Sequence, residues 1–392
     1  MASLQKKKIL ILCGDLGDGH IQAASAIKQA AKLHDPEVDA EVVNFSVVTH
    51  PKLHNVGKYC YTQWITKFPL MYGYLFQKTR DENAFSHLFK KLKFYTLSRL
   101  VRLLEDVRPD VIVSTFPGAA AGISMLKENG LTDLPTVTVI TDHTDHSYWL
   151  HPYTDRYIVA SGHVRDALIR HGVPFEQISV TGIPIRSQFS AKLNRDALRA
   201  KHNLDPSVPV VLVMGGGFGL IAKECFSTLF SDDILKTMQF IIICGRNEKL
   251  RLQLEADTAP YRDRITLKGY VDDIHEWMAL ADLAITKPGG LTSSEAIALK
   301  LPMLLYKPLP GQEKDNASYL IKEGVALEAK SDTELVGHLQ ALLKNPDSLI
   351  QLKENAARLE NSQAAYLALD AILHTESVEL PHDLRPAVYA RA

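Results

Sequence analysis

The sequence lacks an apolar run long enough to cross a membrane, since no stretch approaches the roughly 18 residues that a spanning helix needs. Its basic start, MASLQKKK, is followed only by the apolar run ILILC, which is shorter than the core of a signal peptide. We therefore expect a cytoplasmic protein, and any contact with the inner face of the cell membrane would be peripheral.

The sequence also lacks paired cysteines and an excess of charge of one sign. Its four cysteines are Cys13, Cys60, Cys225 and Cys244, and none forms a CxxC pair or another metal-binding spacing. Scattered thiols indicate a reducing compartment and small apolar core residues rather than a disulfide framework. The net charge of −1 gives no reason to expect nucleic acid as a partner.

The arrangement of apolar runs predicts an α/β protein with two Rossmann-like domains. A chain of 392 residues exceeds one ordinary core, and short strand-like runs alternate with helical patterns in both halves. The expected strands are 9–13, 40–45, 111–115, 136–141, 156–161 and 178–182, then 210–219, 239–245, 264–271, 283–290 and 302–308. Two such domains face each other across a cleft, and parallel sheets bind ligands at the carboxyl ends of their strands.

Residues 183–209 are polar and contain three prolines, so we place the domain junction there. The expected parts are an N-terminal domain (1–185), a linker (186–208), a C-terminal domain (209–365), and a C-terminal helix with a tail (366–392). We expect this last part to return to the N-terminal domain.

Three glycine-rich junctions between a strand and a helix are the main binding signal. They are GDLGDGH (14–20), MGGGFGL (214–220) and TKPGGLTSSEA (286–296). None has the GK[ST] of a P-loop, and the first does not have the GxGxxG spacing. The N-terminus of a helix offers free N–H groups and a positive dipole end to an anion, so these junctions suit phosphates. The alternative is that each is an ordinary strand–helix turn.

His20 ends the first junction, at the start of a helix expected from about Ile21. The helix dipole disfavours an imidazolium there, and a neutral imidazole can accept a proton. Asp142, at the end of the strand 136–141, is a second candidate base or an orienting partner, and His143 and His146 remain possible. The alternatives are a turn histidine and a structural aspartate. The run DHTDH could suggest a metal cluster, but its place at a strand end argues against one, and no DxD signature is present.

Glu295 follows the glycines of the third junction. Thr292 and Glu295 have the spacing of a capping box, so a helix-capping carboxylate is one interpretation. The other is an acceptor for the two hydroxyls of a ribose.

Residues 52–104 interrupt the α/β pattern with many basic and aromatic residues. Ten lysines and arginines stand against only Asp81 and Glu82, and aromatic residues are interleaved with them. This composition suits an anionic lipid surface, although an ordinary amphipathic insert packed on the domain would look similar. The candidate lipid contacts are Trp64, Lys90, Lys91 and Lys93.

The segment TKPGGLTSSEAIALKLPMLLYKPLPGQEKDNASYL (286–320) resembles the nucleotide-sugar-binding region of family 28 glycosyltransferases. Within it, PGQE followed by Asn316 is similar to the branch of monogalactosyldiacylglycerol synthases and processive diacylglycerol glucosyltransferases. The same branch is indicated by MGGGFG, ICGRNEKL (243–250), GDLGDGHIQAASAI (14–27) and VITDHTDHSYWLHPYTDRYIVAS (139–161). The resemblance covers roughly residues 8–365.

The resemblance implies a GT-B fold and inverting transfer of glucose or galactose from a UDP-sugar to diacylglycerol or a glycosyl-diacylglycerol. It implies that no cofactor or metal is required, and that the part around 52–104 meets the membrane. Glu295 would bind the ribose, Tyr270 and Val271 the uracil, and Arg246 would supply positive charge, while Gln312 and Glu313 would read the hexose hydroxyls. The other expected donor-binding residues are Gly17, Gly19, Gly216, Gly217, Gly289, Gly290, Thr292 and Asn316.

Three other functions fit parts of the pattern. An N-acetylglucosaminyltransferase acting on a peptidoglycan lipid intermediate is a close alternative, but PGQE and the basic, aromatic insert favour diacylglycerol. A noncatalytic UDP-sugar sensor at the membrane would be expected to lose His20 or Glu295, and the sequence keeps both. A sugar epimerase shares the architecture but has no need of a lipid-facing insert.

Overall fold

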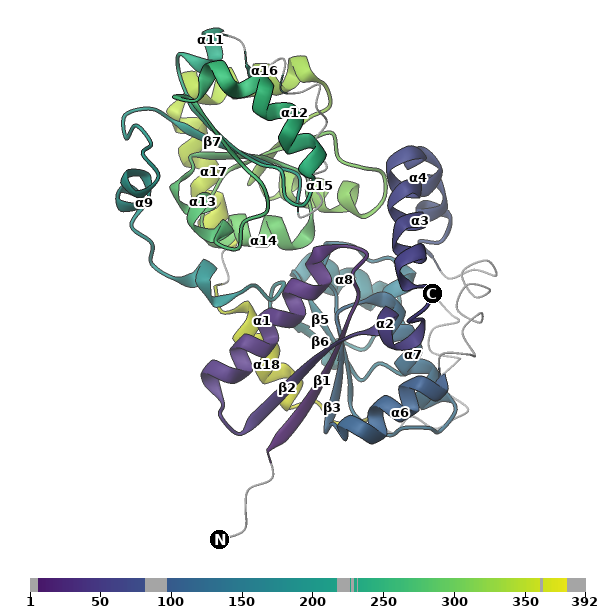
Figure 1. Ribbon diagram of the computed structural model, residues 1–392. Coiled ribbons are helices and arrows are strands. Elements are labelled where there is room, and N and C mark those ends of the chain that lie inside the picture. Colours follow the sequence, from purple (N-terminus) through teal and green to yellow (C-terminus); the bar gives the residue numbers. More distant parts are fainter. Residues whose placement is uncertain are drawn as a thin grey trace. The chain divides into compact units, whose positions relative to one another are not determined.

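The chain folds around two separate parallel β-sheets with helices packed against them (Figure 1). The computed structural model describes residues 6–81, 97–216, 226, 229, 230, 232–359 and 362–378. The described residues form two units, the first within Met1–Ser187, Pro310–Gln312 and Gln363–Ala392, and the second within Gln188–Leu309 and Glu313–Ser362. Among the described residues, every helix is too short or too polar to cross a membrane.

The first sheet has six parallel strands in the order β2-β1-β3-β4-β5-β6. Its interior strand β1 is buried on both faces: Ile9 and Ile11 pack in one core, and Leu10 and Leu12 in the other. The strands are β1 (Lys7–Cys13), β2 (Val38–Asn44), β3 (Val111–Ser114), β4 (Thr136–Val139), β5 (Arg156–Val159) and β6 (Ile178–Val180). The helices are α1 (Asp18–His34), α2 (Phe45–Thr49), α3 (His54–Lys67), α4 (Pro69–Lys78), α6 (Leu97–Val107), α7 (Pro117–Glu128) and α8 (Gly162–Arg170).

The second sheet also has six parallel strands, in the order β12-β11-β10-β7-β8-β9. This is the strand order of the Rossmann fold, in which ligands bind where the order reverses, here between β7 and β10. The strands are β7 (Val210–Met214), β8 (Gln239–Ile243), β9 (Ile265–Lys268), β10 (Leu283–Thr286), β11 (Met303–Tyr306) and β12 (Ala326–Ala329). The longer helices are α12 (Glu248–Thr258), α13 (Ile274–Leu280), α14 (Gly290–Ala298), α15 (Gln312–Lys322), α16 (Asp332–Lys344) and α17 (Pro346–Leu359).

All the strands expected from the sequence are present, and the predicted α/β class with two Rossmann-like sheets is confirmed. Two details differ. The edge strand β12 was missed, because its four residues include Glu328 and do not read as an apolar run. Helix α1 begins at Asp18 rather than near Ile21, so His20 lies inside its first turn.

The last helix of the described chain, α18 (Ala364–Leu373), packs against α1 in the first unit (Figure 1). Its buried residues Ala368 and Ile372 share a core with Ile27 of α1. Just beyond α18, the Val378 N–H donates a hydrogen bond of 2.9 Å to Asp155 Oδ1. The chain that leaves the second unit is therefore fixed on the first.

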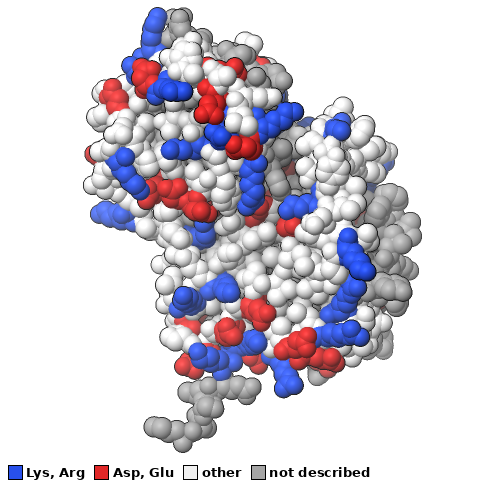
Figure 2. Space-filling view, viewed as in Figure 1, with Lys and Arg blue, Asp and Glu red and all other residues white. Residues whose placement is uncertain are grey.

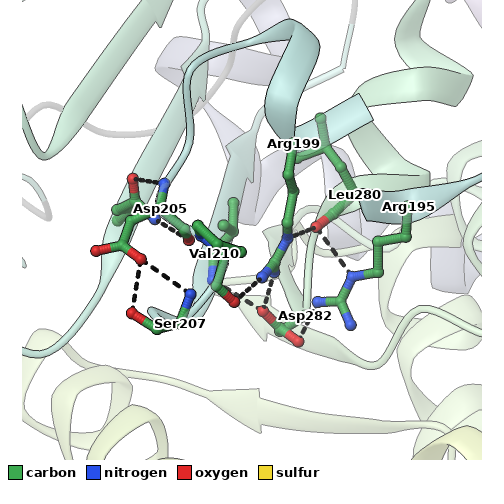
Figure 3. A network of polar contacts seen from close by, with 9 residues as sticks. Arg195, Arg199, Asp205, Ser207, Val210, Leu280 and Asp282 are labelled. Carbon is green, nitrogen blue, oxygen red and sulfur yellow. Dashed lines mark hydrogen bonds and ion pairs between the residues drawn. The ribbon is translucent and has the colours of Figure 1, made fainter. Parts of the chain in front are cut away.

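The segment 186–208, expected to be a linker, contains a short helix, α9 (Arg195–Lys201), that is held on the second unit (Figure 3). Arg199 Nη2 lies 2.6 Å from Asp282 Oδ2, Arg195 pairs with the other carboxylate oxygen, and the Val210 N–H donates to Oδ2 at 2.9 Å. Burial alone would raise the pKa of Asp282, but the Val210 N–H and the two arginines outweigh it and hold the pKa below its usual value. This network connects α9 to the starts of β7 and β10.

Candidate active site

The glycine loop between β1 and α1 presents the N-terminus of a helix that no side chain caps. Gly17 occupies the N-cap position without a side-chain hydrogen bond, and nothing lies within 4 Å of where a Cβ would stand. Gly14 is required for packing, because a Cβ there would meet Phe116 at 2.5 Å. Gly19 is the second residue of α1 and, like Gly17, is partly exposed. The loop therefore leaves open space beside the first turn of α1.

The His20 ring contacts a hydroxyl and two aromatic rings. Its Nδ1 lies 3.1 Å from Thr141 Oγ1, and its ring lies edge-to-face to Phe116 and Trp149 at centroid distances of 5.4 and 6.0 Å. Burial lowers the pKa of His20 from 6.5 to about 4, so the imidazole is neutral at physiological pH. A backbone hydrogen bond between the ring and Thr115 raises the pKa, but burial outweighs it. When Nδ1–H donates to Thr141, the lone pair of the neutral ring is on Nε2.

Asp142 directly follows Thr141, so both candidate bases lie at the carboxyl edge of the first sheet. Asp142 is half-buried, and two tyrosines are close enough to respond to its charge. The pKa of Tyr72 is raised by burial, by Tyr61 and by Asp142, and that of Tyr148 by burial and by Asp142. The Asp142 charge is thus close enough to both tyrosines to disfavour their ionisation.

The other histidines of DHTDH, His143 and His146, are both buried. Both ring nitrogens of His146 are engaged, Nε2 with the Phe76 carbonyl at 2.8 Å and Nδ1 with the Tyr148 N–H at 3.2 Å. His143 is buried, and burial lowers its pKa to about 3. Asp145 pairs with Arg80. In the part of the chain that the structure describes, no three His, Cys, Asp or Glu side chains are grouped as a metal site would require.

A continuous run of aromatic rings leads from helix α3 to His20. Successive rings lie 5.5–6.2 Å apart between centroids, within the range of aromatic contact. In order, they belong to Trp64, Tyr72, Phe76, Tyr148, Trp149 and His20. Trp64, expected at the lipid surface, is half-buried at the start of this run. The other expected lipid contacts, Lys90, Lys91 and Lys93, lie outside the described residues.

In the second unit, β10 is followed by the bend at Gly289 and Gly290 and then by α14. No side chain caps α14, and the hydroxyls of Ser293 and Ser294 donate to the carbonyls of Gly289 and Gly290 at 2.9 Å. The first N–H groups of a helix have no partner inside it, so here they are available to an anion. Gly216, after the adjacent strand β7, has φ +68 and is only partly covered, while Gly217 lies outside the described residues.

Glu295 lies in the second turn of α14 and is only 6% exposed. Because Gly289 is the N-cap and Thr292 is the third helical residue, the capping-box interpretation of Thr292 and Glu295 is wrong. Glu295 is therefore a buried carboxylate behind the glycine bend.

Arg246 and Tyr270 come together at the carboxyl ends of the adjacent strands β8 and β9. The guanidinium carbon of Arg246 lies 4.5 Å from the centre of the Tyr270 ring, which is 45% exposed. This stacking gives a flat, positively charged surface in a loop region. Val271 follows and is half-buried.

Helix α15 supports the same bend from its other side. Asn316 is fully buried, and its Nδ2 donates to the Pro288 carbonyl at 2.9 Å, so it positions the bend. Glu313 Oε2 accepts a hydrogen bond of 2.7 Å from the Leu309 N–H, and burial raises the pKa of Glu313. Gln312 is the first residue of α15.

Lys287 is a basic residue of this region that the sequence analysis did not single out. Its Nζ bonds to the Lys307 carbonyl, and its charge lowers the pKa of Glu313 against the effect of burial. A lysine placed directly before PGG in the third junction was the available signal.

Comparisons with known proteins agree with this geometry. Residues 20–185 match the family model described as monogalactosyldiacylglycerol (MGDG) synthase, and residues 223–359 match that of glycosyl transferases group 1. A processive diacylglycerol beta-glucosyltransferase of Bacillus cereus (strain G9842) is 34% identical over 384 residues, which are 97% of this chain and 96% of that protein. Its counterpart in Bacillus thuringiensis (strain Al Hakam) is 33% identical over the same shares of both chains.

Solved structures show the same fold at low sequence identity. MurG of Acinetobacter baumannii has a TM-score of 0.58 and 17% identity, and the match covers 94% of this chain and 99% of that one. The MnaA–UDP complex of S. aureus has a TM-score of 0.60 and 15% identity, with 95% and 99% covered. The GT-B fold implied by the sequence resemblance is confirmed. The chain belongs to the family of processive diacylglycerol beta-glucosyltransferases.

Proposed function

We propose that this protein transfers a hexose from a UDP-sugar to the hydroxyl of diacylglycerol, or of a glycosyl-diacylglycerol, and so makes membrane glycolipid. The observation that carries this proposal is the neutral His20 in an uncapped first helical turn, with its Nδ1 beside the Thr141 hydroxyl. Family membership supports it, because the relatives at 34% and 33% identity are named diacylglycerol beta-glucosyltransferases.

His20 would act as the general base. Its Nε2 would take the proton of the acceptor hydroxyl while the hydroxyl oxygen attacks the anomeric carbon of the donor. The bond between that carbon and the UDP oxygen breaks, UDP leaves with the electron pair, and the configuration inverts. Thr141 would hold the imidazole in the tautomer with the lone pair on Nε2, a role that a hydrogen-bonding neighbour serves for many catalytic histidines. Asp142 is the alternative base.

The donor would bind at the carboxyl edge of the second sheet. The free N–H groups of α14 and the loop at Gly216 suit the diphosphate, and the developing charge on UDP would be stabilised by the same groups. Glu295 would accept the ribose hydroxyls, and the stacked Arg246 and Tyr270 would contact the uracil and add positive charge. Since these groups can carry the diphosphate, we propose that no metal or other cofactor is needed.

Glucose is the hexose that the relatives' names favour, and galactose is the alternative that the MGDG synthase model suggests. Glu313 and Gln312 at the start of α15 are the proposed readers of its hydroxyls. The two sugars differ at one hydroxyl, so the donors must be compared directly.

We propose an anionic membrane surface as the third partner, met by helices α3 and α4. These helices expose several large apolar side chains, led by Leu70 (81% exposed), Tyr59 (65%) and Tyr74 (61%). Their face in Figure 2 is largely uncharged, and Lys67 and Lys78 lie near their ends. Apolar and aromatic side chains flanked by lysines suit the headgroup region of a bilayer, where the hydroxyl of diacylglycerol is found. The protein would thus act on the inner face of the cell membrane.

One assay tests the proposal. The protein is incubated with anionic vesicles that contain diacylglycerol and, in separate reactions, with labelled UDP-glucose, UDP-galactose and UDP-N-acetylglucosamine. We expect label in the lipid fraction with UDP-glucose or UDP-galactose. A parallel reaction replaces diacylglycerol by a peptidoglycan lipid intermediate, and transfer to that lipid alone, from UDP-N-acetylglucosamine alone, would support the alternative transferase. Binding of UDP-sugar without transfer to any lipid would support the sensor.

A further inference from the structure

The helix pair α3–α4 is linked to both loops that carry the candidate bases. At the end of α4, the Ser147 N–H donates to the Arg80 carbonyl at 2.8 Å and the Ser147 hydroxyl to the Thr79 carbonyl at 2.7 Å. Arg80 also pairs with Asp145. Several bonds thus fix α4 to the loop 142–149, which contains Asp142.

Helix α3 is linked to the glycine loop through a single carboxylate, that of Asp15, whereas several residues link α4 to its loop. Asp15 Oδ2 lies 2.8 Å from His54 Nε2 in the first turn of α3 and 3.0 Å from Lys58 Nζ one turn later. Asp15 is 8% exposed, and its second oxygen, Oδ1, is buried without a hydrogen-bond partner in the described chain. The polar contacts of this side chain therefore run to α3.

Asp15 is also placed to influence His20. It lies in the loop between β1 and α1, five residues before His20, so a short backbone segment joins the two. His20 itself is held by hydrogen bonds with the Thr141 hydroxyl and the Thr115 backbone and by aromatic contacts. A shift of α3 would thus reach the base through Asp15.

We propose that Asp15 is a positioning residue, which couples the seating of α3–α4 on a lipid surface to the placement of His20 for proton transfer. The inference rests on the proposed function. The exposed apolar residues of α3–α4 would be surrounded by lipid on a bilayer and by water in solution, so the position of the pair can differ between the two. The ion pairs of Asp15 connect the position of α3 to the glycine loop. A coupling of this kind typically changes a rate or affinity by 5-fold or more.

The test compares one acceptor in two settings. Initial rates are measured with labelled UDP-glucose and a short-chain diacylglycerol dissolved as monomers, with and without anionic phosphatidylglycerol vesicles that hold no diacylglycerol. The proteins are wild type, Asp15→Asn, the double variant His54→Gln/Lys58→Gln, and the triple combination. Asp110→Asn is the matched control, because that carboxylate accepts the Lys8 N–H at the opposite end of β1.

We expect vesicles to stimulate wild type and Asp110→Asn, and Asp15→Asn to lose at least about 5-fold of that stimulation. Co-sedimentation with vesicles and calorimetric UDP affinity should stay within about 2-fold in Asp15→Asn. The double variant should lose the vesicle stimulation to a similar extent. The triple combination should lose little more, because Asp15→Asn and the double variant remove the same contacts between Asp15 and α3.

Three results would overturn the inference. They are a wild type that vesicles do not stimulate, an Asp15→Asn variant that keeps the stimulation, and a variant whose rates fall equally in both settings, as a purely structural defect would cause. Absence of transfer by wild type to this acceptor or to vesicle-borne diacylglycerol, with any of the three UDP-sugars, would instead remove the proposed function, and the inference with it.

Discussion

The pH dependence of the reaction follows from the environment of His20. Burial lowers its pKa from 6.5 to about 4. One pKa unit corresponds to about 1.4 kcal/mol, so the shift disfavours the imidazolium by roughly 3 kcal/mol. In the free enzyme, His20 is therefore neutral throughout the physiological range, and only acidification through about pH 4 removes the base.

The assay is the pH profile of kcat/KM for the UDP-sugar, which reports groups of the free enzyme. We expect a plateau that extends from pH 8 to about pH 5, with a fall of unit slope below it. A midpoint near 6.5, the value of an ordinary exposed histidine, would refute the burial argument.

Substitution separates His20 from Asp142. His20→Ala should lower kcat by about 100-fold or more, since general-base assistance is worth at least that much, while UDP affinity stays nearly unchanged. His34→Ala is the matched control, because His34 lies at the other end of α1 with its ring against Tyr366. Near-normal turnover of His20→Ala would make Asp142 the better candidate.

Three further predictions test the donor site, the fold and the membrane surface. Glu295→Ala should weaken UDP binding by roughly 1.5–3 kcal/mol, the range for a charged hydrogen-bond partner, and unchanged affinity of the folded variant in calorimetry would exclude the ribose role. Burial lowers the pKa of His143 to about 3 in the folded protein, so the unfolded state binds the extra proton as pH falls below 6.5. This histidine alone should therefore cost about 2 kcal/mol of stability at pH 5, and urea unfolding should show a loss smaller by that amount for His143→Gln. Replacement of Lys90, Lys91 and Lys93 by glutamate should release the protein from anionic vesicles, whereas equal pelleting of wild type and variant at low salt would contradict the electrostatic argument.

The sequence was sufficient to predict the parts of the site that depend on strand ends. Parallel strands buried on both faces appear as short apolar runs, and the residues that follow them share one edge of the sheet. His20 after β1 and Asp142 after β4 therefore lie on the same edge, and Gly216 and Gly289 follow the adjacent strands β7 and β10.

The features of the site that could not be predicted from the sequence depend on contacts between segments that are distant in the chain. The sequence shows Asp15 only as a polar residue of a glycine-rich loop. The fold shows that His54 and Lys58 bind its carboxylate. Asn316 was expected among the donor-binding residues, and only the fold shows that its Nδ2 donates to the Pro288 carbonyl. Residue spacing does not show where a side chain points or which residue it contacts. The roles of Asp15 and Asn316 could therefore be assigned only from the structure.

Transfer of label from UDP-glucose to diacylglycerol, compared between wild type and His20→Ala, tests the central claim most directly. The account predicts a glucosyl-diacylglycerol product that carries the inverted, β configuration, with formation slowed by about 100-fold or more in the variant. A wild-type protein that binds UDP but leaves diacylglycerol unmodified with every UDP-sugar tried would contradict it.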